Sequence, residues 1–199
     1  MQVASSAART GEVTALLRAA RNGDAAAIDR IVPLVYDDLR RVARRQLARE
    51  FGAENVRPTE LVHEAYVKLS LGGADVAVDR AHFLAIAARA MRQVLVDDAR
   101  NRRAVKRGGG WQRATLSGSH WVADFDVDEL LTLNDALEEL DPRQRQVVEC
   151  RFFGGMEDSE IAEALGVTDR TVRRDWVKAR AWLYRALAER GSANALAKL

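Results

Sequence analysis

Residues 154–187, GGMEDSEIAEALGVTDRTVRRDWVKARAWLYRAL, determine the fold class that the whole chain suggests. Apolar residues recur there at the spacing of one face of a short helix: Ile161, Ala162 and Leu165. Gly166 follows, where a helix C-terminus favours a residue that tolerates left-handed dihedrals. Thr168 is a good N-cap for a second helix, with Thr171 three residues behind it. The stretch therefore predicts two helices joined by a tight turn.

The second of these helices would have an inward apolar stripe and a basic outer side. The stripe has the spacing of a buried helix face and consists of Val172, Trp176, Ala179, Leu183 and Leu187. The basic residues that this spacing leaves outside the stripe are Arg170, Arg173, Arg174 and Lys178. Such an arrangement is typical of a DNA-reading helix-turn-helix, because arginine pairs with guanine edges and holds phosphates. The alternative is an ordinary helical hairpin with a solvated basic face.

The composition favours an all-α protein with a substantial hydrophobic core. Of the 199 residues, 48% are hydrophobic and only three are proline. The single cysteine, Cys150, excludes an internal disulfide and indicates a reducing compartment, and its apolar neighbours predict a small core residue. The sequence has neither a run of about 18 apolar residues nor the apolar core of a signal peptide. We therefore expect no membrane span and a cytoplasmic location.

The net charge of +2 conceals three blocks of alternating sign. Residues 80–113 contain nine basic and two acidic residues, and residues 114–142 contain eight acidic residues and no basic ones. Residues 168–190 contain seven basic and three acidic residues. Two basic blocks separated by an acidic one indicate two modules that face nucleic acid and a linker of opposite charge. For any single block, the alternative is a solvated helix face.

The predicted elements form two small helical domains joined by a flexible acidic linker. Residues 1–11 are small and polar, which predicts a disordered N-terminus. The first domain covers residues 12–107, and Pro33 would either kink its second helix or reset the start of that helix. Its helices are expected over residues 12–21, 25–50, 58–69 and 80–103. Residues 108–127 form the linker, which opens on the triplet Gly108, Gly109 and Gly110.

The second domain covers residues 128–190, and residues 191–199 form a tail. Helices are expected over residues 127–140 and 142–152, with Asp141 as the cap of the latter and Pro142 at its first position. The glycine triplet is not a phosphate loop, because no strand precedes it and no Gly-Lys-Ser/Thr follows. No metal-ligand spacing relates His63, His82 and His120. Since no catalytic constellation stands out either, we predict no metal, no cofactor and no enzymatic activity.

Several motifs together resemble one family, the bacterial sigma factors of the small extracytoplasmic-function (ECF) type, which have only regions two and four. The motifs similar to region four are DPRQRQVVE at 141–149, RFFGG at 151–155 and EIAEALGVT at 160–168. Those that resemble region two in one branch of the family are PTELVHEAYVKL at 58–69, RAHF at 80–83, VDDAR at 96–100 and KRGGG at 106–110. The resemblance covers about residues 12–190. It implies an all-α protein that binds core RNA polymerase and directs it to promoters.

The resemblance implies that region two docks on the coiled coil of the largest polymerase subunit and opens the minus-ten promoter element. Opening needs basic side chains for the backbone and a pocket for an unstacked base. The positions that match polymerase contacts are Thr59, Glu60, His63 and Glu64. Those that match minus-ten contacts are Arg89, Arg92, Gln93, Arg100 and Arg103. Further contacts to upstream phosphates would come from Arg102, Lys106 and Arg107.

The resemblance assigns the base pocket to residues 72–79. Relatives carry a Trp-Leu-Tyr-Arg-type run where this chain has HFLAI at residues 82–86. Only Phe83 could then supply an aromatic stacking platform, and a core position is the favoured alternative for this residue.

The resemblance implies that region four binds the minus-thirty-five element through the helix-turn-helix residues Arg170, Thr171, Arg173, Arg174 and Lys178, and that it contacts the polymerase flap. The acidic linker would thread the active-site channel and the RNA exit path, where a negative chain mimics nucleic acid; a solvated tether is the alternative. A rival function is a conventional transcription regulator that binds duplex DNA without being a polymerase subunit. An enzyme with a DNA-binding tail is a second rival, which the missing catalytic residues disfavour.

Thr59 is a candidate regulatory phosphorylation site. Relatives begin this helix with an acidic run that pairs with basic residues of the polymerase, whereas Glu60 and Glu64 are the only acids here before Tyr66. A phosphate on Thr59 would add about −1.5 to −2 charges in the first helical turn, where the helix dipole favours an anion. The resemblance implies a Ser/Thr kinase as regulator, and an anti-sigma factor is another partner left open. The alternative is that Thr59 only caps a helix that begins near Glu60.

Overall fold

The computed structural model describes residues 2–24, 26–51, 57–70, 77–106 and 127–192, and these parts contain eight α-helices, one π-helical turn and no strand. The all-α prediction is confirmed. The helices that we call the first unit are α1 (Gln2–Arg21), α2 (Ala26–Phe51), α3 (Pro58–Ser70) and α4 (Arg80–Lys106). The second unit consists of α5 (Val127–Glu138), α6 (Pro142–Val148), the π-helical turn η1 (Glu149–Phe153), α7 (Asp158–Leu165) and α8 (Asp169–Glu189).

The N-terminal helix is longer than the sequence predicted. We expected a disordered segment over residues 1–11 and a helix from residue 12, but α1 begins at Gln2. The physical reason lies in the composition of this segment, because alanine is the strongest helix former and no proline interrupts Ala4, Ala7 and Ala8. The bounds of α2, α3, α4 and α5 lie within three residues of the predicted ones, and α2 continues through the exposed Pro33 without a new start.

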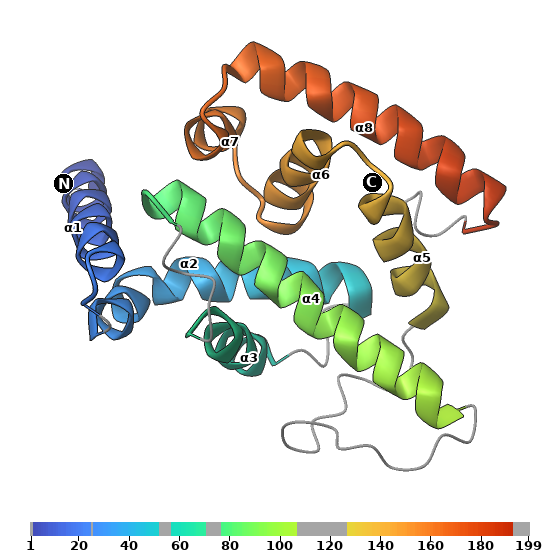
Figure 1. Ribbon diagram of the computed structural model, residues 1–199, viewed down its shortest axis with the longest axis horizontal. Coiled ribbons are helices and arrows are strands. Elements are labelled where there is room, and N and C mark those ends of the chain that lie inside the picture. Colours follow the sequence, from blue (N-terminus) through green and yellow to red (C-terminus); the bar gives the residue numbers. More distant parts are fainter. Residues whose placement is uncertain (1, 25, 52–56, 71–76, 107–126, 193–199) are drawn as a thin grey trace.

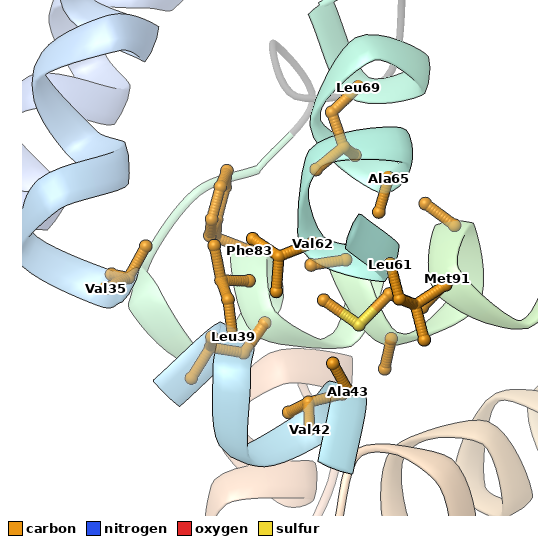
Figure 2. Close-up of a cluster of buried hydrophobic side chains, with 14 of the residues drawn as sticks. Val35, Leu39, Val42, Ala43, Leu61, Val62, Ala65, Leu69, Phe83 and Met91 are labelled. Carbon is orange, nitrogen blue, oxygen red and sulfur yellow. The ribbon is translucent and has the colours of Figure 1, made fainter. Parts of the chain in front are cut away.

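α3 packs on α2 and α4, and this contact forms much of the core of the first unit (Figure 2). The buried residues of α3 recur at helical spacing and are Leu61, Val62, Ala65 and Leu69. They lie in one cluster with Leu39 of α2 and with Phe83 and Met91 of α4. Phe83 is 1% exposed. The alternative of a core position for Phe83 is therefore confirmed, and it offers no stacking platform in this arrangement.

The helix-turn-helix forms as the sequence predicted. Gly166 ends α7 with a φ of 64°, the left-handed conformation that its place in the sequence indicated. Thr168 caps α8, since its extended backbone lets the side-chain oxygen accept a hydrogen bond from the backbone N–H of Thr171 at 3.3 Å. The apolar stripe of α8 is fully buried at Val172, Ala179, Leu183 and Leu187, while Trp176 is partly buried against the same cores.

The helix that we predicted over residues 142–152 divides into α6 and the wider turn η1. Asp141 and Pro142 start α6 as expected, with Oδ1 of Asp141 accepting from the backbone N–H of Arg143 at 3.1 Å. In η1, the backbone N–H of Gly154 donates to the carbonyl of Glu149 at 2.9 Å, five residues back. A Cβ on Gly154 would lie 2.5 Å from the carbonyl oxygen of Cys150, so this close approach requires glycine.

The two units pack directly on one another, and α4 is the central helix of the molecule (Figure 1). On one side α4 contacts α2 and α3, and on the other it contacts α5, η1 and α7. α5 belongs to both cores, because Val127, Leu130 and Leu131 pack in the first cluster whereas Leu133 and Leu137 pack in the second. The predicted boundary at residues 127–128 is therefore not a boundary in the packing. The predicted linker over residues 108–127 lies, except for Val127, outside the described residues.

Candidate nucleic-acid interface

The N-terminal half of α8 presents a basic surface to solvent. Of the residues predicted to face DNA, those with exposed side chains are Arg170, Arg173, Arg174 and Lys178. Thr171 is half-buried, and its hydroxyl lies 3.0 Å from that of Thr168, so it supports the start of the helix. The exposed cations stand on one side of a helix whose N-terminus itself favours phosphate. The structure thus brings together four of the five predicted residues on an open surface.

Two of these arginines have acidic neighbours, but their contacts are long and exposed. Nε of Arg173 lies 3.5 Å from Oδ2 of Asp158, and Nε of Arg174 lies 3.5 Å from Oδ1 of Asp175. The side chains of both arginines are more than half exposed. Because the arginine side of each pair is open to solvent and the contacts are long, each pair contributes only about 0–1 kcal/mol. Both guanidinium groups can therefore leave these carboxylates and contact DNA at little cost in free energy.

Asp175 anchors the helix from its inner side. It is 2% exposed, and Nε of Arg143 on α6 donates to its Oδ2 at 2.6 Å. Burial by itself raises the pKa of Asp175, but the hydrogen bonds and charges of Arg143 and Arg174 outweigh it and hold the pKa below its ordinary value. The carboxylate therefore stays ionised and ties α8 to α6.

The residues of α4 that were predicted to contact the minus-ten element differ widely in exposure. Arg100 and Arg103 are exposed, and Arg103 lies 3.3 Å from Asp128 of α5. Arg89 and Gln93 are half-buried. Arg92 is 1% exposed. α4 is therefore not an open basic surface like α8.

Arg92 lies between the two units in what we call the Arg92 cluster, which consists of Arg92, Asn134, Glu138, Glu149 and Phe153. Nη1 of Arg92 donates to Oδ1 of Asn134 at 2.5 Å, and Nη2 donates to Oε1 of Glu149 at 2.6 Å. Nη2 also lies 3.5 Å from Oε1 of Glu138, and the guanidinium carbon lies 5.9 Å from the ring centre of Phe153. Glu149 is 3% exposed, so both members of this ion pair are buried. Arg92 does not face solvent in this arrangement, so its predicted contact with DNA would require the arrangement to change.

A second polar contact between the units involves Arg45 of α2. Its Nη1 donates to the carbonyl oxygen of Gly155 at 2.7 Å. Gly155 has a φ of 64°, and a Cβ there would lie 1.5 Å from Nη1 of Arg45. Ala85 of α4 adds an apolar contact, because it packs in one cluster with Val147 and Ile161 of the second unit. Several contacts along α2 and α4 thus hold the units together.

The predicted polymerase-binding residues lie on α3, away from the Arg92 cluster. Thr59 and His63 are exposed, and Glu60 and Glu64 are half-buried. α3 begins at Pro58, and the backbone N–H of Glu60 donates to the carbonyl of Arg57 at 3.1 Å. Thr59 is therefore the second residue of the helix and not its cap, which corrects the capping alternative. Oε1 of Glu60 accepts from Nη1 of Arg57 at 2.9 Å.

Some predicted features fall where the structure gives no description. The base pocket over residues 72–79 is described only from Ala77, which is fully buried. Arg107 and His120 lie outside the described residues, as does the side chain of Lys106. Within the described parts, no group of three His, Cys, Asp or Glu side chains could hold a metal ion. No helix among them has the length and apolar character needed to cross a membrane.

The partners of Arg92 were not predicted from the sequence. Asn134 and Glu149 are 42 and 57 residues away along the chain, and no local pattern connects them to α4. One signal was present: Arg92 stands among the apolar residues Ala88, Met91 and Leu95, at the spacing of a buried helix face. The prediction that Cys150 is a core residue is confirmed, since its side chain is buried. Burial, and then the charge of Glu149, raise the pKa of its thiol to about 12, as expected of an inert cysteine.

Comparisons with known proteins find one matching family model and a similar solved structure. A family model described as ECF sigma factor matches residues 10–189. Among solved structures, the chain is similar to the structure of CnrH in complex with the cytosolic domain of CnrY. That match has a TM-score of 0.38 and 23% sequence identity, and it covers 89% of this chain and 98% of the other. No match is found among curated proteins.

Proposed function

The chain belongs to the ECF sigma factor family, and from this premise we propose how its two units share promoter recognition. As a member of this family, it binds core RNA polymerase and directs promoter recognition and transcription initiation. We assign residues 128–190, which cover most of the second unit, to binding of the minus-thirty-five element, and residues 12–107, which cover most of the first unit, to binding of polymerase and opening of the minus-ten element. The observation that carries this division is the capped helix-turn-helix with four exposed cations on α8.

The minus-thirty-five contacts are assigned to Arg170, Thr171, Arg173, Arg174 and Lys178. Arg173 and Arg174 contribute most, because they stand one turn into α8 on the side away from the buried Val172. A bidentate arginine contact with guanine discriminates by about 1–3 kcal/mol, whereas a phosphate contact strengthens binding to all sequences alike. Arg170 and Lys178 are assigned to phosphates.

The minus-ten contacts on α4 require the two units to separate. Arg100 and Arg103 are exposed as the molecule stands, but Arg92 contacts DNA only after its bonds to Asn134 and Glu149 break. Arg89, three residues before Arg92, and Gln93, the residue after it, are half-buried. We assign the compact arrangement to the free protein and an open arrangement to the polymerase complex. Contacts with polymerase and DNA then replace those that α4 makes with α5, η1 and α7.

α3 is assigned to the coiled coil of the largest polymerase subunit, and the second unit to the flap. The exposed edge of α3 has little negative charge, because Arg57 neutralises Glu60 at 2.9 Å. A phosphate on the exposed hydroxyl of Thr59 would restore that charge in the first turn of the helix. We therefore propose that a Ser/Thr kinase activates polymerase binding through Thr59.

The test of this switch compares core polymerase binding by the unmodified protein, the kinase-treated protein, Thr59→Ala and Thr59→Glu. The phosphorylated protein and Thr59→Glu are expected to bind more tightly than the unmodified protein and Thr59→Ala. Ser70→Ala is a matched control, because Ser70 is exposed at the opposite end of α3, where the helix dipole disfavours an anion. Equal binding by the unmodified and phosphorylated forms would remove Thr59 from the mechanism.

The test of the proposed function is run-off transcription by purified protein and core polymerase on a library of genomic fragments. Thr59→Glu is included so that a missing modification does not hide activity. Promoter-dependent transcripts are expected with kinase-treated wild type and with Thr59→Glu, and not when Arg173→Ala and Arg174→Ala are combined with either of them. A regulator that is not a polymerase subunit would bind duplex DNA but would not be retained by core polymerase. We further propose a cytoplasmic location, where polymerase is found, and no catalytic activity of the chain itself.

A further inference from the structure

Val177 is an exposed apolar residue in the middle of the basic surface of α8. Its side chain is 65% exposed, whereas the other branched aliphatic residues of the helix, Val172, Leu183 and Leu187, are fully buried. Valine also forms helices less well than the arginine and lysine around it, because its branched side chain is restricted in a helix. The fold therefore gives no reason for valine at this position.

The position of Val177 places it with the DNA-facing cations. It follows Arg173 by four residues and Arg174 by three, so all three share one face of α8. It is eight residues after Asp169, which is about 12 Å along the helix axis at 1.5 Å per residue. In a helix-turn-helix the second helix lies in the major groove with its N-terminal residues at the base edges, so Val177, one turn after Arg173 and Arg174, can reach the bases. Tyr184, the other exposed large apolar residue of α8, lies about 22 Å from the helix start and outside this reach.

The neighbours of Val177 indicate what it contacts. The exposed cations next to it are Arg173, Arg174, Lys178 and Arg180. An apolar protein surface would have to desolvate these charges, whereas DNA phosphates pair with them. On base edges in the major groove, the apolar group is the C5-methyl of thymine, and aliphatic side chains pack against it.

We propose that Val177 contacts the C5-methyl group of a thymine in the minus-thirty-five element and is a specificity-determining residue. This inference rests on the proposed function of α8. It adds an apolar contact to the polar ones assigned above. It also predicts that the minus-thirty-five element contains a thymine within about one helical turn of the bases that Arg173 and Arg174 contact.

The experiment is a double-mutant cycle with the holoenzyme, formed from the full chain and core polymerase, on a promoter from the fragment library. Each thymine of the minus-thirty-five element is replaced in turn by deoxyuridine, which lacks only the methyl group. With wild type, one replacement should weaken binding about fourfold, the effect of burying one methyl group. With Val177→Ala, the same replacement should have no effect. Alanine is a better helix former than valine, so this variant keeps the helix.

Tyr184→Ala is the matched control, because it removes an exposed apolar side chain from the same helix outside the groove. It should keep the fourfold response to deoxyuridine. The proposal is overturned if Val177→Ala also keeps the full response, if no replacement affects wild type, or if the element contains no thymine. The Arg173→Ala/Arg174→Ala variant then distinguishes failure of the Val177 proposal from failure of the proposed function. If this variant binds the promoter as tightly as wild type does, α8 is not the DNA-reading helix. If the variant binds weakly, only the role of Val177 has failed.

Discussion

α4 and α8 are both assigned to promoter DNA, yet the structure presents them in opposite ways. In the N-terminal half of α8, four cations are exposed, and the acidic neighbours of Arg173 and Arg174 lie at 3.5 Å. On α4, Arg92 is 1% exposed and donates to Asn134 and Glu149 at 2.5 and 2.6 Å. α8 can bind duplex DNA as it stands. α4 can present Arg92 only after the second unit has moved away.

This difference has a consequence for the order of events at a promoter. We propose that recognition of the duplex minus-thirty-five element needs no change in the protein, whereas opening of the minus-ten element is coupled to separation of the units. A free molecule in the compact arrangement therefore binds single-stranded minus-ten DNA poorly. Polymerase must bind the open arrangement more tightly than the compact one to shift the population between them.

The largest expected effect comes from Glu149→Ala, which removes the buried partner of Arg92. Breaking a buried ion pair from one side destabilises a fold by about 3–5 kcal/mol, because the remaining charge is left without compensation. Separation of the units removes this cost in free energy, because it exposes the guanidinium group of Arg92 to water. We expect a larger radius of gyration in X-ray scattering and tighter binding of a single-stranded minus-ten oligonucleotide by the free protein.

Two further variants sharpen this first prediction. Glu138→Gln changes an acid of the Arg92 cluster whose side chain is half exposed and 3.5 Å from Arg92, so an effect below about 1 kcal/mol is expected. Arg92→Met with Glu149→Leu removes both buried charges and should leave the compact form as stable as before or more so. An unchanged scattering profile and oligonucleotide affinity for Glu149→Ala would show that this ion pair does not hold the units together.

The second prediction concerns the exposed helix. Arg173→Ala and Arg174→Ala should each weaken binding of duplex minus-thirty-five DNA by about 1–3 kcal/mol and relax its sequence specificity. Because both side chains are more than half exposed, neither change should alter the stability or compactness of the protein. The measurement is fluorescence anisotropy with cognate and scrambled duplexes. Arg185→Ala, an exposed change near the far end of α8, serves as control. Wild-type affinity and specificity in both variants would contradict the assignment.

The same two helices show why the sequence predicted one part of the site and missed the other. The caps, turn and stripe of α8 depend on residues within a few positions of one another, such as Gly166, Thr168 and Thr171, so a local pattern contains them. The same is true of Asp141 and Pro142 at the start of α6. The burial of Arg92 depends on partners 42 and 57 residues away, and η1 depends on a backbone contact at Gly154. Neither can be seen in a local pattern. The extent of α1 was underestimated because a polar composition was given more weight than its alanines.

The smallest expected effect concerns Asp175, a buried carboxylate that, unlike Glu149, joins two helices of the same unit. Its pKa is lowered in the folded protein, so its contribution to stability is present above the ordinary aspartate pKa of about 4 and is lost as the pH falls through the folded value. Asp175→Asn should therefore lower the free energy of unfolding at pH 7 by about 1 kcal/mol, a modest amount because the side chain of Arg143 is 48% exposed.

Urea denaturation followed by circular dichroism between pH 7 and pH 3 measures this difference, which should shrink below about pH 4 as the wild-type carboxylate takes up its proton. Glu189→Gln, an exposed change on the same helix, should show no such trend. A difference that stays constant over the whole pH range would mean that the charge of Asp175 does not stabilise the unit. Because Asp175 makes its bond within the second unit, the scattering profile of Asp175→Asn at pH 7 should match that of wild type. A larger radius of gyration would mean that α8 also helps to hold the units together. The proposed difference, in which contacts between the units involve α4 but do not depend on α8, would then be wrong.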